Sequence, residues 1–398
     1  MKKLLVIIGI AFLLCGCGSA NKDDVVNEFK KDVNNSKSYK LSGTMEIMND
    51  EESFVYNLET YYMKDDYYKV VLVNQTNNHE QIILKNNDEV YVITPELNKS
   101  FKFQSEWPNN SSQAYLLNSV LKDLIEDKDI ELMDNEQKYV IKSKVNYPNN
   151  DELSYQKIYF DKDNNLEKVE VYDKNDIIKI KVMFDKIDLK ANLSKSDFEI
   201  KEYIDTNEDN VCEEANCKQE ENKTKTTENE NNNNNNNNNA EITENNQTDQ
   251  NNSNQNENDN QNTETNIENE ENNTNNTQTS GFNLDSVIYP LYIPGETYLT
   301  NSETIKTEDG NRVILTFTGE KNFVIIEEMA VSEPTMKIIP VYGDPLMLSN
   351  SIGALTGNSL TWDSNNISYY LASTDLSTNE MLTIANSLGS TTMVAKEK

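Results

Sequence analysis

The residues of this chain that are best suited to redox, metal-binding or catalytic chemistry are its four cysteines and its one histidine. Cys212 and Cys217 are separated by four residues, and outside the cytoplasm they could oxidise to a small disulfide loop. A zinc site normally takes four Cys or His ligands, and neither a histidine nor a second cysteine pair lies near these two. We therefore expect no metal site, and it stays open whether Cys212 and Cys217 are bonded.

The sequence does not indicate a catalytic site. His79 stands in a polar stretch before an apolar strand pattern, which is typical of a histidine at a strand end. Phosphate-binding Gly loops and the HExxH, GxSxG and SxxK patterns are absent from the sequence. The 68 acidic residues are so numerous that no carboxylate pair stands out as an acid–base couple. We expect a non-enzymatic protein with no catalytic residue, cofactor or metal.

The N-terminus, MKKLLVIIGIAFLLCGCGSA, has the three parts of an export signal: two lysines, an apolar run over residues 4–14, and small residues. The run is shorter than the ~20 residues that span a bilayer. It ends in LCGC, which resembles the bacterial lipobox with Cys17 at the modified position. The alternative is an ordinary signal peptide that contains cysteines.

The lipobox resemblance implies a lipoprotein. Residues 1–16 would be removed as the signal peptide, and Cys17 would carry a diacylglyceryl group, with fatty acids such as palmitate, on a lipidated N-terminus of residues 17–21. Two acyl chains make a stable anchor. No later segment of the sequence is apolar enough to cross a membrane, so we expect a lipid-anchored protein on the outer face of the cytoplasmic membrane.

The formal charge of −32 argues against nucleic acid as a partner, because the phosphate backbone would repel the chain. Residues 206–280 hold 17 acidic and 3 basic residues and almost no apolar side chains. Such a segment cannot bury enough surface to offset the entropy of ordering. We predict a disordered Asn/Glu-rich linker over residues 204–280, between two foldable domains.

The first domain, residues 22–203, has the pattern of an antiparallel meander. A short amphipathic helix is predicted near residues 22–33, followed by alternating strands such as YKLSGTMEI, YKVVLV, QIILK and EVYVIT. After an inserted helix the meander resumes and ends in IIKIKVMFDKIDL. The pattern predicts about ten or eleven strands, and an open sheet this long should curl.

The stretch FKFQSEWPNNSSQAYLL, residues 101–117, interrupts the meander at Trp107 and Pro108. Asn110 with Gln113 is a plausible capping box for the inserted helix. Its apolar stripe must pack on the concave face of the curled sheet, which is then either filled or left as an apolar pocket. The stripe comprises Leu116, Leu117, Val120, Leu121, Leu124 and Ile125; with Trp107, we take Leu117, Leu121 and Leu124 as candidate concave-face contacts.

The second domain, residues 281–394, reads as a small α+β module. Hairpin strands surround Asp309-Gly310, and shorter strands run on to SLTWDSNNISYYLAS. A final helix has Ser377 as its N-cap, Glu380 completing the capping box, and Gly389 at its end.

Four tyrosines crowd the second and third strands, as the pairs Tyr61-Tyr62 and Tyr67-Tyr68. Adjacent strand residues face opposite ways, so one tyrosine of each pair should point inward and the other outward. Ordinary cross-strand packing is the favoured interpretation, and an outer face for a protein partner is the alternative.

Taken together, an N-terminal helix and an antiparallel half-barrel with helices on its concave face resemble the LolA/LolB lipoprotein-carrier fold family. The segment YFDKDNNLEKVEVYDKNDIIKIKVMFDKIDLKANLSKSDFEI looks like its closing strands, with Asp197-Phe198 at the end. VYVITPELNKSFKFQSEWPNNSSQAYLL is similar to the corresponding region of the LolA-like sporulation and germination lipoproteins of endospore-forming Firmicutes, the GerS-like group. The second domain is similar to C-terminal modules of these lipoproteins and of RseB/MucB-type regulators.

The resemblance implies a membrane-anchored, non-enzymatic binding protein of sporulation or germination whose partner is a cell-wall (cortex) amidase. The alternative that it implies is a carrier or sensor of the LolA or RseB/MucB type, which holds a lipid or an acyl chain in the half-barrel. The long Asn-rich insert departs from the compact arrangement of such families and puts rigid packing of the two domains in doubt.

Overall fold

A computed structural model describes residues 22–49, 52–87, 89–134, 137–203 and 287–388 of the chain. The predicted signal peptide, Cys17, the linker at 204–280 with Cys212 and Cys217, and Gly389 lie outside these residues. We call residues 22–203 the half-barrel part and residues 287–388 the C-terminal part. Both belong to one compact unit.

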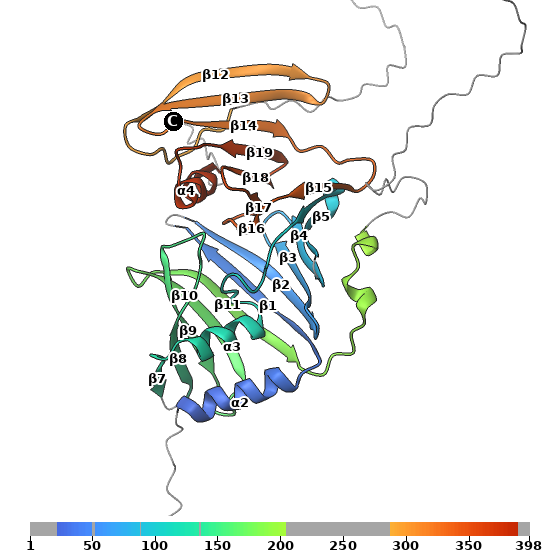
Figure 1. Cartoon of the computed structure of the whole chain (residues 1–398), viewed down its shortest axis with the longest axis vertical. Helices are drawn as coiled ribbons and strands as arrows, with labels where there is room; N and C mark the ends of the chain where they lie inside the picture. The colour runs from blue at the N-terminus through green and yellow to red at the C-terminus, as the bar shows by residue number, and fades with distance from the viewer. Residues whose placement is uncertain (1–21, 50–51, 88, 135–136, 204–286, 389–398) are drawn as a thin grey trace, which may run out of the picture. The chain divides into compact units, whose positions relative to one another are not determined.

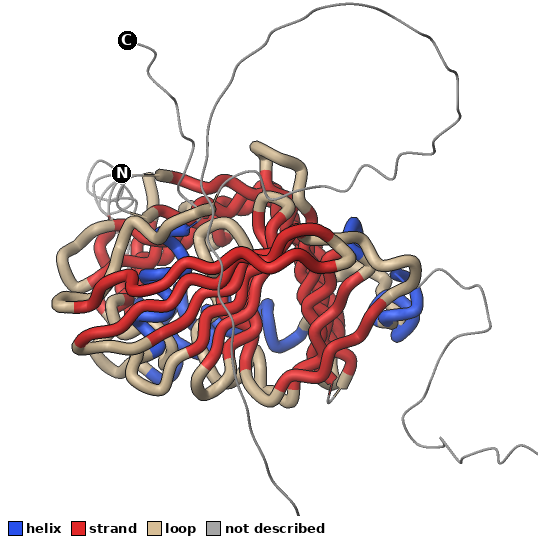
Figure 2. Tube along the Cα trace, turned by 90° about the horizontal axis from the view of Figure 1, so that it is seen from above, coloured by secondary structure: helices blue, strands red, loops and turns tan. Residues whose placement is uncertain are grey.

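Strands make up about half of the described chain and far more of it than the few helices do (Figure 2). The prediction of a mainly β protein with helices is therefore confirmed. The half-barrel part contributes eleven strands. They are β1 (Ser38–Met48), β2 (Ser53–Met63), β3 (Tyr67–Asn74), β4 (Glu80–Asn86), β5 (Glu89–Thr94), β6 (Lys99–Phe103), β7 (Glu131–Asp134), β8 (Tyr139–Lys144), β9 (Leu153–Phe160), β10 (Leu166–Asp173) and β11 (Ile178–Asp188).

These strands form two meanders that meet at β1 and β11, in the order β6-β5-β4-β3-β2-β1-β11-β10-β9-β8-β7. The chain therefore does not resume beside β6 after the inserted helix but crosses to the opposite edge of the sheet at β7. The alternation predicted for the first strand is confirmed, because every second residue of β1 is buried. A short 3-10 helix, η2 (Pro95–Leu97), connects β5 and β6.

Two helices, α2 (Lys22–Asn35) and α3 (Leu117–Glu126), lie across the inner face of the curled sheet (Figure 1). Val25, Phe29 and Val33 of α2 are buried in one cluster with the inward-facing side chains of the strands. The Phe29 ring meets the Phe160 ring of β9 edge-on at 5.4 Å. The predicted half-barrel with helices on its concave face is thus confirmed.

A smaller apolar cluster lies on the outer face of β3, β4 and β5. Here the chain after β11 returns through two 3-10 helices, η3 (Lys195–Phe198) and η4 (Ile200–Tyr203). The Ser194–Asp197 capping box fixes η3, and Phe198 is fully buried 5.7 Å from the Tyr67 ring. The Asp197-Phe198 element therefore closes the back of the sheet.

The C-terminal part builds a seven-stranded antiparallel sheet in the order β12-β13-β14-β19-β18-β17-β16. Its strands are β12 (Thr297–Thr307), β13 (Gly310–Gly319), β14 (Phe323–Met329), β16 (Asp344–Met347), β17 (Ile352–Leu355), β18 (Ser359–Ser364) and β19 (Ile367–Ala372). Asn365 and Asn366, between the last two strands, both have left-handed φ angles, as a type I′ hairpin turn requires. Its core contains the fully buried Trp362, stacked on Tyr369.

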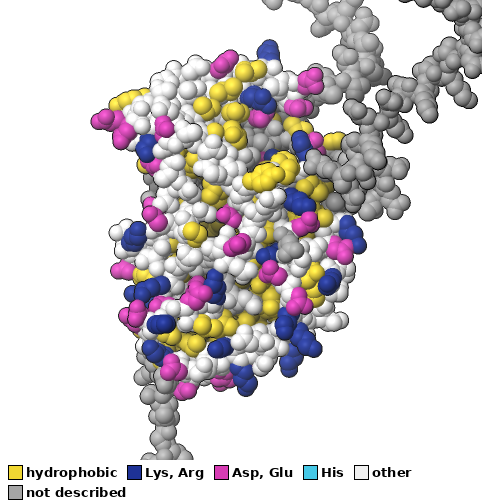
Figure 3. All heavy atoms as spheres, viewed as in Figure 1, with side chains coloured by type: hydrophobic (Ala, Val, Ile, Leu, Met, Phe, Trp, Pro, Cys, Tyr) yellow, Lys and Arg dark blue, Asp and Glu magenta, His cyan; other side chains and the backbone are white. Residues whose placement is uncertain are grey.

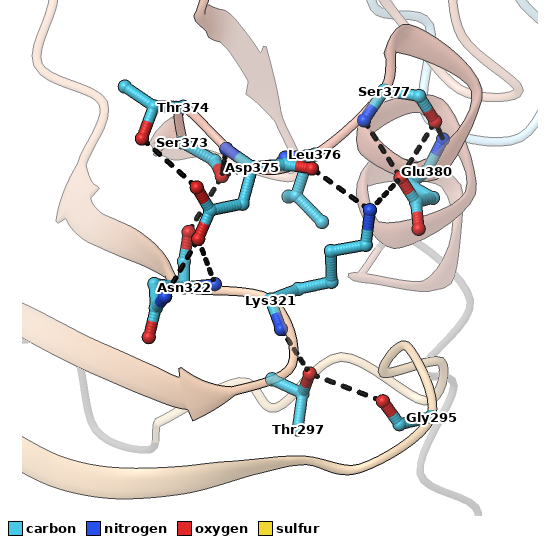
Figure 4. Close-up of polar contacts among 10 residues, drawn as sticks. All are labelled: Gly295, Thr297, Lys321, Asn322, Ser373, Thr374, Asp375, Leu376, Ser377 and Glu380. Carbon is cyan, nitrogen blue, oxygen red and sulfur yellow. Dashed lines mark hydrogen bonds and ion pairs between the residues drawn. The ribbon is translucent and has the colours of Figure 1, made fainter.

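Helix α4 (Thr378–Leu388) contributes five buried residues to this second core. Its start follows the predicted capping box: the Ser377 amide donates to Glu380 Oε2 at 2.8 Å, and the Glu380 amide donates to Ser377 Oγ at 3.3 Å. Figure 4 shows how Lys321 reaches this end of the helix, with its Nζ 3.6 Å from Glu380 Oε2. Asp375 accepts hydrogen bonds from the backbone and side chain of Asn322.

One strand of the C-terminal part, β15 (Lys337–Val341), joins the first sheet as its twelfth strand and pairs in parallel with β6. The sequence pattern did not indicate this addition. Pro340 fits an edge strand, because it has no N–H to donate to a further neighbour.

Candidate functional site

The corner at Trp107 is fixed through its backbone carbonyl and through its side chain. The buried Lys85 ammonium donates to the Trp107 carbonyl oxygen at 2.7 Å and lies 2.8 Å from Asp66 Oδ2. The Trp107 indole is buried and meets the Tyr68 ring edge-on at 6.0 Å. A buried lysine is tolerated here because its charge is paired and hydrogen-bonded.

The predicted start of the inserted helix is wrong. Helix α3 begins at Leu117, after Leu116 at the N-cap, and not after Asn110. The reason is that the two side chains of the predicted capping box are engaged elsewhere: Asn110 Nδ2 donates to Asp344 Oδ1 at 2.9 Å, and Gln113 Nε2 donates to Ser111 Oγ at 2.7 Å.

A buried polar cluster holds α3 to the wall of the half-barrel. Asp123 accepts a hydrogen bond from Ser112 Oγ at 2.9 Å and another from Gln156 Nε2 at 2.8 Å. Gln156 also lies 3.3 Å from Ser143 Oγ. Burial raises the pKa of Asp123 to about 6, although both hydrogen bonds act to lower it.

The candidate residues of the inserted helix lie in the hydrophobic core. Leu117, Leu121 and Leu124 are all buried there together with Trp107. Ile125, which belongs to the predicted stripe, is 49% exposed instead. Its side chain lies outside the face of α3 that packs on the sheet. The hollow of the half-barrel is therefore filled around α3.

The tyrosine pairs divide between the two faces of the sheet. Tyr62 and Tyr68 pack on the inner face, with ring centroids 5.1 Å apart, while Tyr67 packs under Phe198 on the outer face. Tyr61 also lies on the outer face and has the Lys40 ammonium over its ring. These positions agree with cross-strand packing. His79 contacts Glu96 through Nδ1.

The opening of the half-barrel is occupied by the turn between β16 and β17. We call its residues 348–351 the hairpin tip. All four are buried, and the Leu348 amide closes the turn by donating to the Ser351 carbonyl oxygen at 2.9 Å. The Tyr56 hydroxyl of β2 donates to the Ser349 carbonyl oxygen at 2.8 Å.

Gln81 of β4 makes the second polar contact to this hairpin. Its Oε1 accepts from the Ile352 amide at 2.7 Å, and its Nε2 donates to the Ile352 carbonyl oxygen at 3.5 Å. Val341, Ile352 and Ala354 of the C-terminal part are buried in the same apolar cluster as the inner face of the half-barrel. At the edge of this contact, Lys99 Nζ lies 2.9 Å from the buried Asp363 carboxylate.

A cavity of about 400 Å³ lies beside the hairpin tip, and we call it the mouth cavity. Ile47, Trp107 and Tyr115 line it from the half-barrel part, and Leu291, Leu348 and Leu382 from the C-terminal part. Lys179 and Glu152 are the charged residues in its described lining. This size and lining suit a binding site for an uncharged group.

Exposed apolar side chains lie next to this cavity. Leu291 is 63% exposed and Tyr292 is 40% exposed, and both also line the cavity. On the face shown in Figure 3, acidic and basic side chains are interspersed and hydrophobic side chains lie exposed between them.

Sequence reasoning missed Tyr56 and Gln81 as contact residues. A weak signal exists, because Gln81 is a polar residue on the same side of β4 as Ile83, which belongs to the inner apolar cluster. Within the described ranges, no three His, Cys, Asp or Glu side chains come together in a way that could hold a metal ion. None of the helices in those ranges is both long and apolar enough to cross a bilayer.

Comparison with known proteins shows that the chain belongs to the YdcC-like sporulation protein family. The profile of that family, described as sporulation protein YdcC-like, matches residues 1–198. A particular relative is sporulation protein YdcC of Bacillus subtilis (strain 168). It is 31% identical over 388 residues, which cover 97% of this chain and 96% of the relative.

Solved structures overlap less closely. A chain in the complex of the CwlD amidase from Clostridioides difficile with the GerS lipoprotein is 17% identical and covers 43% of this chain and 97% of its own, with a TM-score of 0.26. A chain of the Pseudomonas aeruginosa MucA/MucB complex is 10% identical and covers 92% of this chain and 98% of its own, with a TM-score of 0.29. A LolA superfamily protein from Nitrosomonas europaea is 10% identical and covers 46% of this chain and 98% of its own, with a TM-score of 0.27. At these TM-scores the overlaps carry no functional information.

Proposed function

We propose that this member of a sporulation family is a non-enzymatic binding lipoprotein, held on the outer face of the cytoplasmic membrane by lipid on Cys17. The observation that carries the binding role is the mouth cavity, which has a largely uncharged lining and exposed Leu291 and Tyr292 beside it. The lipobox-like LCGC of the sequence supports the anchor.

The partner that we propose is a cell-wall amidase of the sporulating cell. Support comes from the sequence resemblance of residues 90–117 to the GerS-like group and from the exposed apolar residues that a protein partner would cover.

The anchor is tested by replacing Cys17 with alanine in the native host. Wild-type chain should sediment with membranes and incorporate a labelled fatty acid, whereas Cys17→Ala should do neither. Cys15→Ala is the matched control, since Cys15 would leave with the signal peptide. Equal labelling of Cys17→Ala and wild type would overturn the lipid assignment.

The role is tested by deletion. A strain without this chain should form spores with altered cortex modification or impaired germination, and a wild-type copy should restore both. Normal cortex composition together with full germination would contradict the proposal.

A second candidate function is binding of a lipid or an acyl chain in the mouth cavity. The cavity favours it through its volume of about 400 Å³ and its apolar residues. Native mass spectrometry after mild extraction separates the two candidates: a retained lipid mass supports the carrier or sensor, and a bare protein mass supports the protein-binding role.

A further inference from the structure

We propose that the inner wall of the half-barrel carries a peptide-binding site around Tyr56 and Gln81, which the chain's own hairpin tip fills, and which an uncharged turn segment of a protein partner occupies when the tip leaves. The inference rests on the proposed function in one respect, namely that the partner is a protein.

The half-barrel contacts mostly the main chain of this hairpin, with one side-chain contact, in which Ser351 Oγ donates to Gln81 Oε1 at 3.3 Å. Gln81 pairs its side-chain amide with both the N–H and the C=O of Ile352, at 2.7 and 3.5 Å. Tyr56 donates its hydroxyl to the carbonyl oxygen of Ser349 at 2.8 Å. Main-chain hydrogen bonds of this kind give a peptide affinity without requiring a particular sequence. The same two side chains can therefore receive another peptide.

The site also defines what kind of peptide fits. The hairpin tip, Leu-Ser-Asn-Ser, carries no charge, and Ile352, which follows it, is 2% exposed in the apolar cluster of the half-barrel. Tyr56 and Gln81 are themselves buried and uncharged, so a charged segment would lose its hydration without gaining a counter-charge from them. The geometry selects a short neutral turn with one apolar anchor residue.

The hairpin tip is seated imperfectly. Asn350 is 7% exposed, yet neither Oδ1 nor Nδ2 of its side chain has a hydrogen-bond partner among the described residues. A buried polar group without a partner weakens the contact that buries it. The mouth cavity lies directly beside the tip and is lined by Leu348, Ser349 and Ile352, so a competing segment has room to enter. The tip is thus a displaceable occupant of the site.

The experiment is a titration of a fluorescent head-to-tail cyclic peptide of residues 345–355, PLMLSNSIGAL, with the purified full chain, followed by fluorescence anisotropy. Wild type should bind weakly, because the tethered tip competes. Ile352→Ala, which removes the apolar contact of the hairpin with the half-barrel, should bind the free peptide at least tenfold more tightly. Adding Gln81→Leu to that variant should reverse the gain.

Two further variants make the result specific. Asn350→Ala removes the unpartnered amide, should seat the tip more firmly, and should lower peptide affinity about threefold below wild type. Gln75→Leu is the matched control, because Gln75 is an exposed glutamine that bonds to Asn57 and not to the hairpin. It should leave peptide binding unchanged.

Circular dichroism and thermal unfolding establish that each variant is folded, and the Asn350→Ala arm keeps the test decisive if Ile352→Ala does not fold. Equal affinity across the variants, or no binding to any of them, overturns the proposal. Failure to capture an amidase from cells would count against the proposed function but leaves this titration interpretable, because its ligand is a synthetic peptide.

Discussion

Replacing Asp123 with asparagine should change how stability depends on pH. Asp123 is 8% exposed, and burial raises its pKa to about 6 from the ordinary value of 3.8. Because the folded-state pKa is the higher one, the folded chain binds this proton more tightly than the unfolded chain does. Stability from this group is therefore fully present below about pH 4 and is lost as the pH rises through about 6.

The size of the effect follows from the shift. One pKa unit corresponds to about 1.4 kcal/mol, so the rise of roughly two units corresponds to about 3 kcal/mol as an upper limit. Asparagine has nearly the same shape and stays neutral. It can turn its Oδ1 toward Gln156 Nε2 and its NH₂ group toward Ser112 Oγ, which can accept, so both hydrogen-bond contacts can be kept.

The assay is urea unfolding of wild type and Asp123→Asn between pH 4.5 and 8. The free energy of unfolding of the variant, relative to wild type, should rise by about 2 kcal/mol across this range, because part of the effect is already present at pH 4.5. Asp32→Asn, an exposed carboxylate on α2, is the control and should show a much smaller change. A difference between Asp123→Asn and wild type that stays constant with pH would refute the reasoning.

Three further predictions test the packing. Leu121→Ala should lower the free energy of unfolding by about 2–5 kcal/mol, whereas Ile125→Ala on the exposed side of α3 should cost less than about 1 kcal/mol; equal costs would contradict the placement of the helix. Gly43→Ala should cost at least about 2 kcal/mol, because the new Cβ would lie 2.0 Å from the Met183 carbonyl oxygen, and a neutral result in chemical unfolding would show that the strands separate easily. Glu327→Gln should stabilise the protein by up to about 3 kcal/mol at pH 8 and by little at pH 5, because burial raises the pKa of Glu327 to about 7; thermal unfolding at both pH values checks the direction.

Local patterns in the sequence predict much of this fold. The alternation of β1, the hairpin turns and the Ser377–Glu380 cap involve neighbours in sequence or adjacent strands, where period and turn chemistry are decisive. The crossing from β6 to β7 and the addition of β15 to β6 join segments far apart in the chain. Strand order of that kind depends on which sheet edges are free in the folded protein. A short stretch of sequence does not contain that information.

The candidate site is harder to predict for the same reason. The buried leucines of α3 follow from helical spacing, and the interruption of the meander follows from the Trp107-Pro108 pair, which lies after the end of β6 at Phe103. The contact of Gln81 with Ile352 spans 271 residues, and neither residue type indicates it. Asn110 was a reasonable N-cap by local rules, but its side chain bonds to Asp344, and that tertiary contact moves the start of the helix to Leu117.

The most direct test of the central claim, that this chain works by binding a protein partner, is affinity capture from sporulating cells. The lipidated chain should be cross-linked in place, purified, and assayed for a co-purifying cell-wall amidase by mass spectrometry and by amidase activity. We predict that the amidase is recovered with wild type and is reduced when Leu291 and Tyr292 beside the mouth cavity are both replaced by serine. Recovery of no amidase from cells in which the chain is abundant would contradict the account.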